Sequence, residues 1–234
     1  MNVIDETKHC RRMIGMALMA MAATAVQAET MTKPAAGVSR IVFNSVGELS
    51  IKSGAEEKVV VEAEQKVLDK LDVSVKGDTL VLATKGSFRT DKGIKYTVTV
   101  KSFRSLKADT SASGNSTVDG FSGSDASVEL NGAGDVALKN LKYEKLGIVI
   151  KSSGNVQASG GGKAVTARIE GSGTIDTTGY AAQSVDAKVE GSGTIRVHAD
   201  DTLKAAIGGA GNIEYKGKAK VTQAITGAGS VDKI

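Results

Sequence analysis

The sequence has few aromatic residues: tryptophan is absent, and tyrosine and phenylalanine number four each among 234 residues. Aromatic side chains supply much of the buried area of most globular cores. A chain this poor in them must build its interior from Val, Ile, Leu and Ala. Composition alone therefore favours a repeat architecture.

Cysteine and histidine are almost missing as well. The single cysteine, Cys10, lies near the N-terminus, and after residue 28 the only histidine is His198. Beyond residue 28 the chain therefore has no disulfide and no thiol chemistry, and a histidine-rich zinc site is excluded. We interpret His198 as a surface residue near a strand end, and we expect neither a cofactor nor a metal.

The N-terminal segment has the order of a secretory signal peptide. A basic patch, a short apolar run and a small-x-small site follow one another: Lys8, Arg11 and Arg12, then residues 13–25, then Val26-Gln27-Ala28. The sequence predicts a signal peptide over residues 1–28, cleaved between Ala28 and Glu29. The apolar run is shorter than the roughly 20 residues that span a bilayer. Arg11-Arg12 also allows a twin-arginine signal, but the residues around the pair fit ordinary secretion better.

The charge of the exported part is mild. Removal of residues 1–28 takes away three basic and two acidic residues, so the formal charge of +4 becomes +3. Scattered lysines give weak attraction to anionic surfaces, whereas nucleic-acid recognition needs clustered arginines with aromatics. We expect an exported protein with no nucleic-acid partner and no integral membrane segment.

A turn made of two small residues, a glycine and a polar residue recurs seven times after residue 110, at spacings of 18 to 20 residues. Its glycines are Gly114, Gly134, Gly154, Gly173, Gly193, Gly211 and Gly229. We expect them to permit a tight corner between strands, because positive φ carries little penalty without a Cβ. The polar residue that follows each glycine can bond neighbouring backbone at the turn.

Aliphatic residues keep fixed positions relative to this glycine. The position four residues before it holds Ile150, Ile169, Val189, Ile207 and Ile225, and the position two after it holds Val156, Ile175, Ile195 and Ile213. Apolar residues at alternate positions indicate strands with one buried face. The sequence predicts an all-β fold, a right-handed parallel β-helix (β-solenoid) with coils of about 20 residues, in which each of these side chains lies on its own kind in the next coil.

We expect one domain after the signal peptide. Residues 29–37 are predicted to be an extended linker, and residues 38–234 the β-helix. Its early coils, 38–108, are irregular, whereas 109–234 form the regular glycine-containing coils. The early coils alternate like strands without the glycine period, and we expect them to blunt the exposed N-terminal edge of the solenoid.

The chain resembles the head GIN domain family, the heads of auto-transporter adhesins, over nearly all of residues 38–234. The resemblance rests on four segments followed by the glycine series: Val59–Glu64, Leu71–Leu82 with Gly77-Asp78-Thr79-Leu80, Tyr96–Val100 and Leu106-Lys107-Ala108. For this family it implies a right-handed β-helix, export in bacteria and a role at the cell surface or envelope. We therefore expect a protein of a Gram-negative bacterium that lies in the periplasm or on the outer surface, or is secreted. No catalytic residues come with the family.

One pair of residues is a candidate for chemistry. Glu170 and Glu190 each stand three residues before their glycine, so they lie on adjacent coils, and Lys151 occupies the same position one coil earlier. Paired carboxylates can serve a retaining glycosidase or bind a cation. We favour a solvated column of charges, relieved by Lys151, Arg168 and Lys188, because β-helix enzymes that act on sugars also present aromatics for stacking.

Two further features were weighed as sites. Tyr143, Tyr180 and Tyr215 fall at unlike offsets from their glycines and so form no ladder on one face. The run Gly160-Gly161-Gly162-Lys163 lacks the spacing of a phosphate-binding loop, and we interpret it as a corner between strands.

Two classes of function remain. We favour an exported, non-enzymatic, adhesin-like module of the surface or envelope that binds an unknown protein or glycan. The alternative is a β-helix protein that binds or cleaves polysaccharide. The last repeat ends at Ile234 with no obvious cap, and an unpaired coil predicts a homo-oligomer formed through the solenoid ends.

Overall fold

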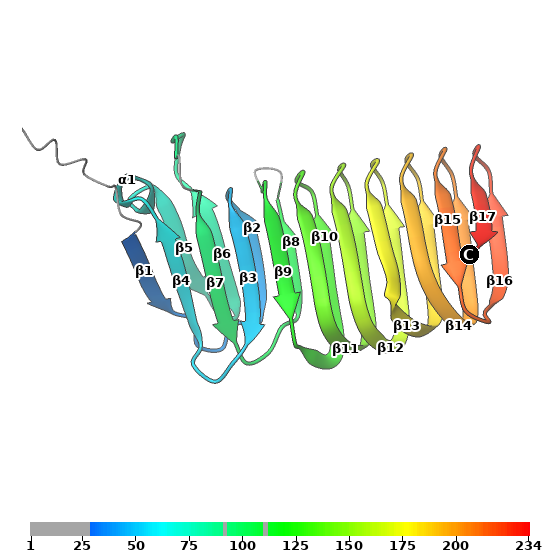
Figure 1. Ribbon diagram of the computed structural model, residues 1–234, viewed down its shortest axis with the longest axis horizontal. Helices are drawn as coiled ribbons and strands as arrows, with labels where there is room; N and C mark the ends of the chain where they lie inside the picture. Colours follow the sequence, from blue (N-terminus) through cyan, green and yellow to red (C-terminus); the bar gives the residue numbers. More distant parts are fainter. Residues whose placement is uncertain (1–28, 91–92, 110–111) are drawn as a thin grey trace, which may run out of the picture.

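The computed structural model describes residues 29–90, 93–109 and 112–234. It is nearly all β, with 68% strand and 2% helix, and its stacked parallel coils form a β-solenoid of about six turns. The predicted solenoid is confirmed. Figure 1 shows the coils in one row along the long axis, from β1 to β17. The predicted signal peptide, with Ala28, lies outside the described residues.

The described elements are, in chain order, β1 (Glu29–Pro34), β2 (Arg40–Asn44), β3 (Glu48–Ser53), β4 (Lys58–Ala63), α1 (Gln65–Leu68), β5 (Leu71–Lys76), β6 (Thr79–Thr84), β7 (Lys95–Val100), β8 (Ser105–Ala108), β9 (Asn115–Asp119), β10 (Ser122–Leu130), β11 (Asp135–Ile150), β12 (Asn155–Ile169), β13 (Thr174–Val189), β14 (Thr194–Ile207), β15 (Asn212–Lys216), β16 (Lys220–Ile225) and β17 (Ser230–Lys233).

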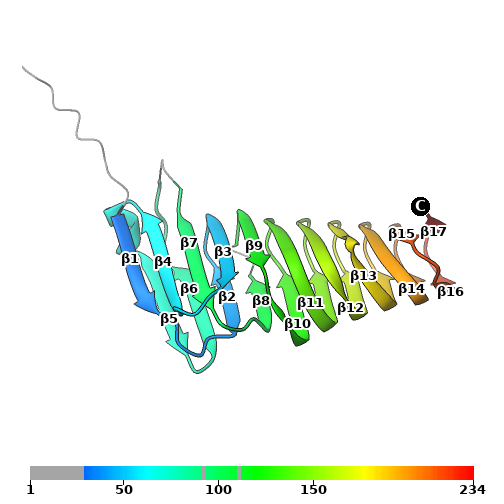
Figure 2. The same ribbon diagram turned by 60° about the horizontal axis from the view of Figure 1, so that its bottom comes forward.

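The strands form two rows that enclose the core. β11 to β14 each bend and contribute to both rows, the first half pairing in one row and the second half in the other. We call face A the outer surface of the row β5, β6, β2, β8, β10, the second halves of β11–β14, and β16. Face B is the outer surface of the row β1, β4, β7, β3, β9, the first halves, β15 and β17. Figure 2 shows the bends between the two rows.

Like side chains lie on one another inside the solenoid. Ile150, Ile169, Val189, Ile207 and Ile225 are successive register partners, and so are Val156, Ile175, Ile195 and Ile213. All but one of these side chains are at most 1% exposed. The exception is Ile225, which is 40% exposed because β16 belongs to the last described coil and nothing stacks on its far side. Stacking between coils, and not the strand pattern alone, produces the burial.

The repeated glycines are needed for contact between coils. A Cβ built on Gly173 would lie 2.0 Å from the carbonyl oxygen of Gly154, and one on Gly193 would lie 2.3 Å from that of Gly173. Of the seven, only Gly114 has a positive φ, of 117°. The expectation that positive φ requires these glycines is therefore wrong for the other six. Each corner backbone rests directly on the corner below, and this leaves no room for a methyl group.

The early strands belong to the same stack but follow a different order. The coil of β2 and β3 lies between the coil of β6 and β7 and that of β8 and β9. β1, β4 and β5 pair antiparallel with their neighbours. These strands and α1 cover the N-terminal end of the stack (Figure 1). Lys33 ties the two rows together there, because its Nζ donates to the carbonyl oxygen of Val73 at 2.7 Å.

Residues 29–37 are not an extended linker. Glu29–Pro34 forms β1, which pairs with β4 from Glu29 opposite Ala63 to Pro34 opposite Lys58. The segment pairs because β4 would otherwise present unsatisfied backbone groups at the end of its row. Pro34 ends this edge strand, where its missing N–H costs the ladder little.

Two buried tyrosines link coils that are not neighbours. The Tyr180 hydroxyl on β13 donates to the carbonyl oxygen of Tyr143 on β11 at 2.8 Å and accepts the Tyr143 N–H at 3.3 Å. The intervening strand β12 has Gly162 at this point, where a Cβ would lie 2.4 Å from the Tyr180 hydroxyl. Gly160–Gly162 lie at the bend of β12, and Gly160 has a φ of 133°. The glycine run therefore opens a passage for the tyrosine.

Candidate binding surface

The carboxylates of Glu170 and Glu190 lie on face A, both exposed to solvent. The two residues occupy the same row, since the Glu170 N–H donates to Ile150 and the Glu190 N–H to Ile169. Lys188 donates a hydrogen bond to the Glu190 carboxylate. This bond, helped by the charges of Lys188 and Arg168, holds the pKa of Glu190 below its usual range.

These contacts favour a solvated column of charges over a catalytic pair. A general acid at neutral pH needs a raised pKa, and that of Glu190 is lowered. Lys151, expected to relieve the column, makes its ion pair with Glu129 at 3.1 Å. His198 lies at 3.3 Å from Asp200, Nε2 to Oδ1. Within the described residues no cluster of three or more His, Cys, Asp or Glu could hold a metal ion.

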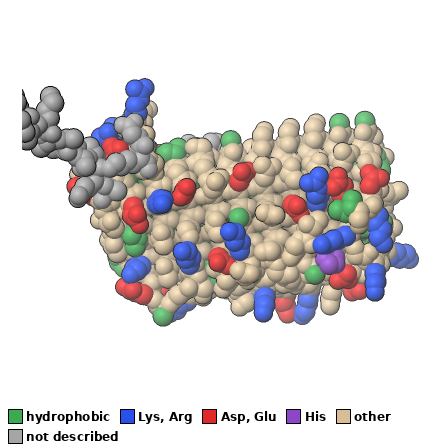
Figure 3. Space-filling view, viewed as in Figure 1, with side chains coloured by type: hydrophobic (Ala, Val, Ile, Leu, Met, Phe, Trp, Pro, Cys, Tyr) green, Lys and Arg blue, Asp and Glu red, His purple; other side chains and the backbone are tan. Residues whose placement is uncertain are grey.

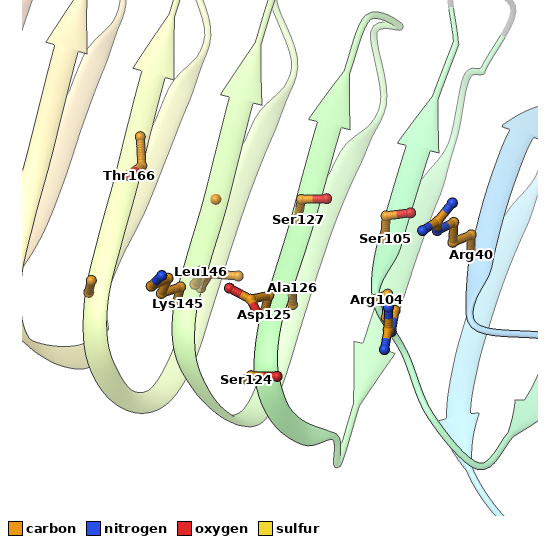
Figure 4. Close-up of a pocket in the computed structure, with 12 residues that line it drawn as sticks. Arg40, Arg104, Ser105, Ser124, Asp125, Ala126, Ser127, Lys145, Leu146 and Thr166 are labelled. Atoms are coloured by element: carbon orange, nitrogen blue, oxygen red, sulfur yellow. The ribbon is translucent and has the colours of Figure 1, made fainter.

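A shallow trough of about 720 Å³ crosses face A over β2, β8, β10, β11 and β12 (Figure 4). Its floor is one row of short residues in register, in which Ser105 pairs with Ser127, Ser127 with Gly147, and Gly147 with Thr166. Side chains alternate between the two faces of a strand, so one outward residue per coil decides whether the surface is low.

The floor is held rigidly from below. Leu106 and Leu146, next to floor residues on β8 and β11, are each 1% exposed in the core. The row continues into charged residues on both sides, with Arg40 opposite Ser105 and Asp186 opposite Thr166. The trough is thus a fixed depression between charged side chains and not a gap that the core could fill.

Positive charge predominates along the trough. Its lining includes Arg40, Arg104 and Lys145 against one carboxylate, Asp125. Arg40 is 3.4 Å from Asp78, Nε to Oδ2. Neither Arg104 nor Lys145 makes an ion pair with any residue that the structure describes, and both side chains are exposed. Figure 4 shows Arg40 and Arg104 together at one end and Asp125 and Lys145 on neighbouring strands.

Face B has smaller depressions whose polar groups are already bonded. One, of about 330 Å³, includes Asn115, Asp135 and Asn155. There the Asp135 carboxylate accepts from the backbone N–H of Asn155 at 3.2 Å and from its side-chain amide at 2.9 Å. In Figure 3, which shows this face, acidic and basic side chains are interspersed and no broad apolar patch is visible. Face A is therefore the better candidate surface.

The sequence contains a signal for the trough that the aliphatic columns do not show. Seven residues before the repeated glycine stand Ser127, Gly147, Thr166, Asp186, Lys204 and Thr222. The first three are short and the next two are charged. Reading this outward column would have located the trough floor, but not Arg40 or Arg104, which come from the irregular coils.

Comparison with known proteins identifies the family of the chain. The family model described as "Putative auto-transporter adhesin, head GIN domain" matches residues 38–219. The chain belongs to the head GIN domain family. A search of curated proteins finds no match.

Solved structures of low sequence identity share the fold of this head GIN domain protein. A "putative adhesin" from Bacteroides fragilis is 22% identical, with a TM-score of 0.84 over 89% of this chain and 97% of that one. A "putative lipid binding protein" from Parabacteroides distasonis is 23% identical, with a TM-score of 0.68 over 89% and 97%. A "putative adhesin" from Parabacteroides merdae is 22% identical, with a TM-score of 0.64 over 89% and 96%.

The family and these structures are described as adhesins or lipid-binding proteins and not as enzymes. In the part of the chain that the structure describes, no helix has the length and apolar character required to cross a bilayer.

Proposed function

We propose that this protein is an exported, non-enzymatic, adhesin-like module of the bacterial surface or envelope, and that its ligand lies in the face A trough. The observation that carries the proposal is the row of short residues from Ser105 to Thr166, which forms a depression larger than those on face B. Membership of an adhesin-like family and the signal-peptide pattern of residues 1–28 support it.

The experiment fills the trough from its floor. A side chain built on Gly147 has no atom closer than 3.8 Å to its Cβ, so Gly147→Tyr should fold while occupying the depression. Ala137→Tyr is the matched control, because Ala137 lies on the same strand and lines a depression on face B. We expect Gly147→Tyr to weaken binding to extracted surface polysaccharide or whole cells by about tenfold or more. Equal binding by both variants would refute the trough as the site.

Polysaccharide cleavage is the alternative function. It would require Glu170 and Glu190 to act as an acid and nucleophile pair, and the hydrogen bond from Lys188 already occupies the Glu190 carboxylate. We expect no glycan hydrolysis by the purified protein. Hydrolysis that is measured and then disappears in Glu170→Gln would establish the alternative.

Export and self-association complete the proposal. We propose cleavage between Ala28 and Glu29, which would leave β1 at the start of the mature chain, and N-terminal sequencing of the exported protein tests it. We also propose contact between copies at the C-terminal end of the stack, where Ile225 and Ile234 are 40% and 60% exposed.

A further inference from the structure

We infer that the ligand of the face A trough is an acidic polysaccharide. The inference rests on the proposed function and specifies its ligand class. It comes from the charges that line the trough and from the chemistry of its floor.

The unpaired cations are spaced for a polymer that carries repeated negative groups. Arg104 immediately precedes β8 and Lys145 lies on β11, with β10 between these two strands. Two strand spacings separate them, roughly 10 Å along the solenoid axis. One carboxylate, Asp125, lies between them, and its charge does not offset both cations.

Carboxylates fit these cations better than neutral groups do. Arginine recognises a carboxylate through two parallel N–H donors, whereas lysine offers a compact point charge. Because neither Arg104 nor Lys145 makes an ion pair within the described part of the chain, each can bond a ligand without breaking an existing pair.

The floor distinguishes a glycan from other polyanions. Ser105, Ser124, Ser127 and Thr166 line the trough, and a hydroxyl both donates and accepts hydrogen bonds, as sugar hydroxyls do. No aromatic side chain lines it, whereas single-stranded nucleic acid binds by stacking bases on aromatics. Among the described residues the exposed large apolar side chains, Val75, Ile225 and Ile234, lie outside the trough. The apolar residues that line it, Ala126, Leu146 and Ala164, are small or buried, so they offer a lipid chain little contact.

Polygalacturonate and its fully methyl-esterified form test the inference, because they share one sugar backbone and differ in the carboxylate charge. We expect the full-length protein to bind the acidic polymer about tenfold or more tightly than the ester. Binding should weaken with added salt, since ions screen exposed charges.

The matched variants separate local charge from net charge. The double variant Arg104→Gln, Lys145→Gln should lose about tenfold or more in affinity for polygalacturonate. The control Lys52→Gln, Lys218→Gln removes the same net charge from exposed residues that line no part of the trough, and it should bind within about twofold of the unaltered protein.

Each result has a defined reading. Equal binding of the acidic and esterified polymers that is still abolished by Gly147→Tyr would overturn the acidic preference and leave the proposed function standing. Binding that is unchanged in the Gly147→Tyr variant would overturn the proposed function and the inference with it. Failure to bind polygalacturonate, or tighter binding to an oligonucleotide or to vesicles of anionic phospholipid, would overturn the acidic glycan as ligand.

Discussion

The corners that contain the repeated glycine have no room for a larger residue. Gly154, Gly173 and Gly193 stand on one another so closely that a Cβ on any upper glycine would meet the carbonyl oxygen of the one below. Backbone this close cannot give way as a flexible side chain can. Contact between coils therefore selects glycine here, although six of the seven repeated glycines lack a positive φ.

Gly193→Ala should destabilise the fold by roughly 1 to 3 kcal/mol, the usual cost of overpacking. Gly208→Ala is the control, because the nearest atom to its Cβ would be 4.0 Å away, and exposed substitutions usually change stability by less than about 0.5 kcal/mol. Denaturation in urea measures both. Equal stability of the two variants would show that the coils do not touch at Gly193.

The aliphatic columns allow one substitution to be compared at two depths. Ile175 is fully buried between coils, whereas Ile225 is 40% exposed on the last one. A buried carboxylate without a partner is costly, so Ile175→Asp should unfold the middle of the stack, and Ile225→Asp should be tolerated. Unchanged thermal unfolding of Ile175→Asp would contradict the inward position of this column.

The residue-level pattern was readable from the sequence because one side-chain position per coil repeats at a nearly constant period. The columns through Ile169 and Ile195 follow from counting alone. The reason for the glycines did not follow, since a sequence does not distinguish a glycine required by φ from one required by close contact. The exposure of Ile225 also depends on what stacks next to it.

At the scale of strands, Tyr180 and Tyr143 couple β13 to β11 across β12. Burial raises the pKa of Tyr143 to about 12, with a smaller contribution from Tyr180, and burial also raises the pKa of Tyr180. In an unfolded chain a tyrosine titrates near pH 10. These tyrosines therefore stabilise the fold fully below pH 10, and the contribution is lost as the pH rises from about 10 to 12.

Alkaline titration tests the raised pKa of these buried tyrosines. The free energy of unfolding should fall between pH 10 and 12, by on the order of 2 to 3 kcal/mol for Tyr143. Ultraviolet absorbance of tyrosinate should show these residues ionising only above pH 10. In Tyr143→Phe the decline in stability should be smaller, at the cost of the 2.6 Å hydrogen bond that the Tyr143 hydroxyl donates to Phe103. An unchanged decline would contradict the raised pKa of Tyr143.

The arrangement of the early strands could not be predicted from local pattern. β2, β4 and β7 all alternate fully buried and less buried residues, as any half-buried strand does. Such alternation identifies a strand but does not show with which other strand it pairs. The placement of β2 and β3 between later strands, and the pairing of β1 with β4, are set by which backbone edges remain open in three dimensions.

At the scale of the whole molecule the two ends differ. Antiparallel strands and α1 cover the N-terminal end. At the other end no described strand covers β16 and β17, and Ile225 on β16 is 40% exposed. The covered end disfavours head-to-tail filaments, so we expect pairs that meet at their C-terminal ends.

Sedimentation measures this association directly. The protein should form a dimer as its concentration rises, and Ile225→Lys with Ile234→Lys should shift it to the monomer, because these side chains are 40% and 60% exposed. A monomer at high concentration for the unaltered protein would contradict the prediction.

The trough belongs to this largest scale, because it exists only where several coils align their short outward residues. The floor of the trough could be predicted from the sequence, because Ser127, Gly147 and Thr166 occupy one position of the repeat. The rest of the trough depends on Arg104, which precedes β8, and on Arg40, which reaches the same surface because β2 is inserted next to β8. Sequence reasoning therefore predicted the solenoid, which the structure confirms, but not the trough in which we propose that the ligand lies.

Because the chain has a single cysteine, labelling of introduced thiols tests most directly whether face A carries the binding surface. With Cys10 replaced by serine, Ser127→Cys places a single thiol on the trough floor and Thr117→Cys places one on face B. We predict that extracted surface polysaccharide slows maleimide labelling of Ser127→Cys and leaves that of Thr117→Cys unchanged. Equal protection of the two thiols, or protection of Thr117→Cys alone, would contradict the account.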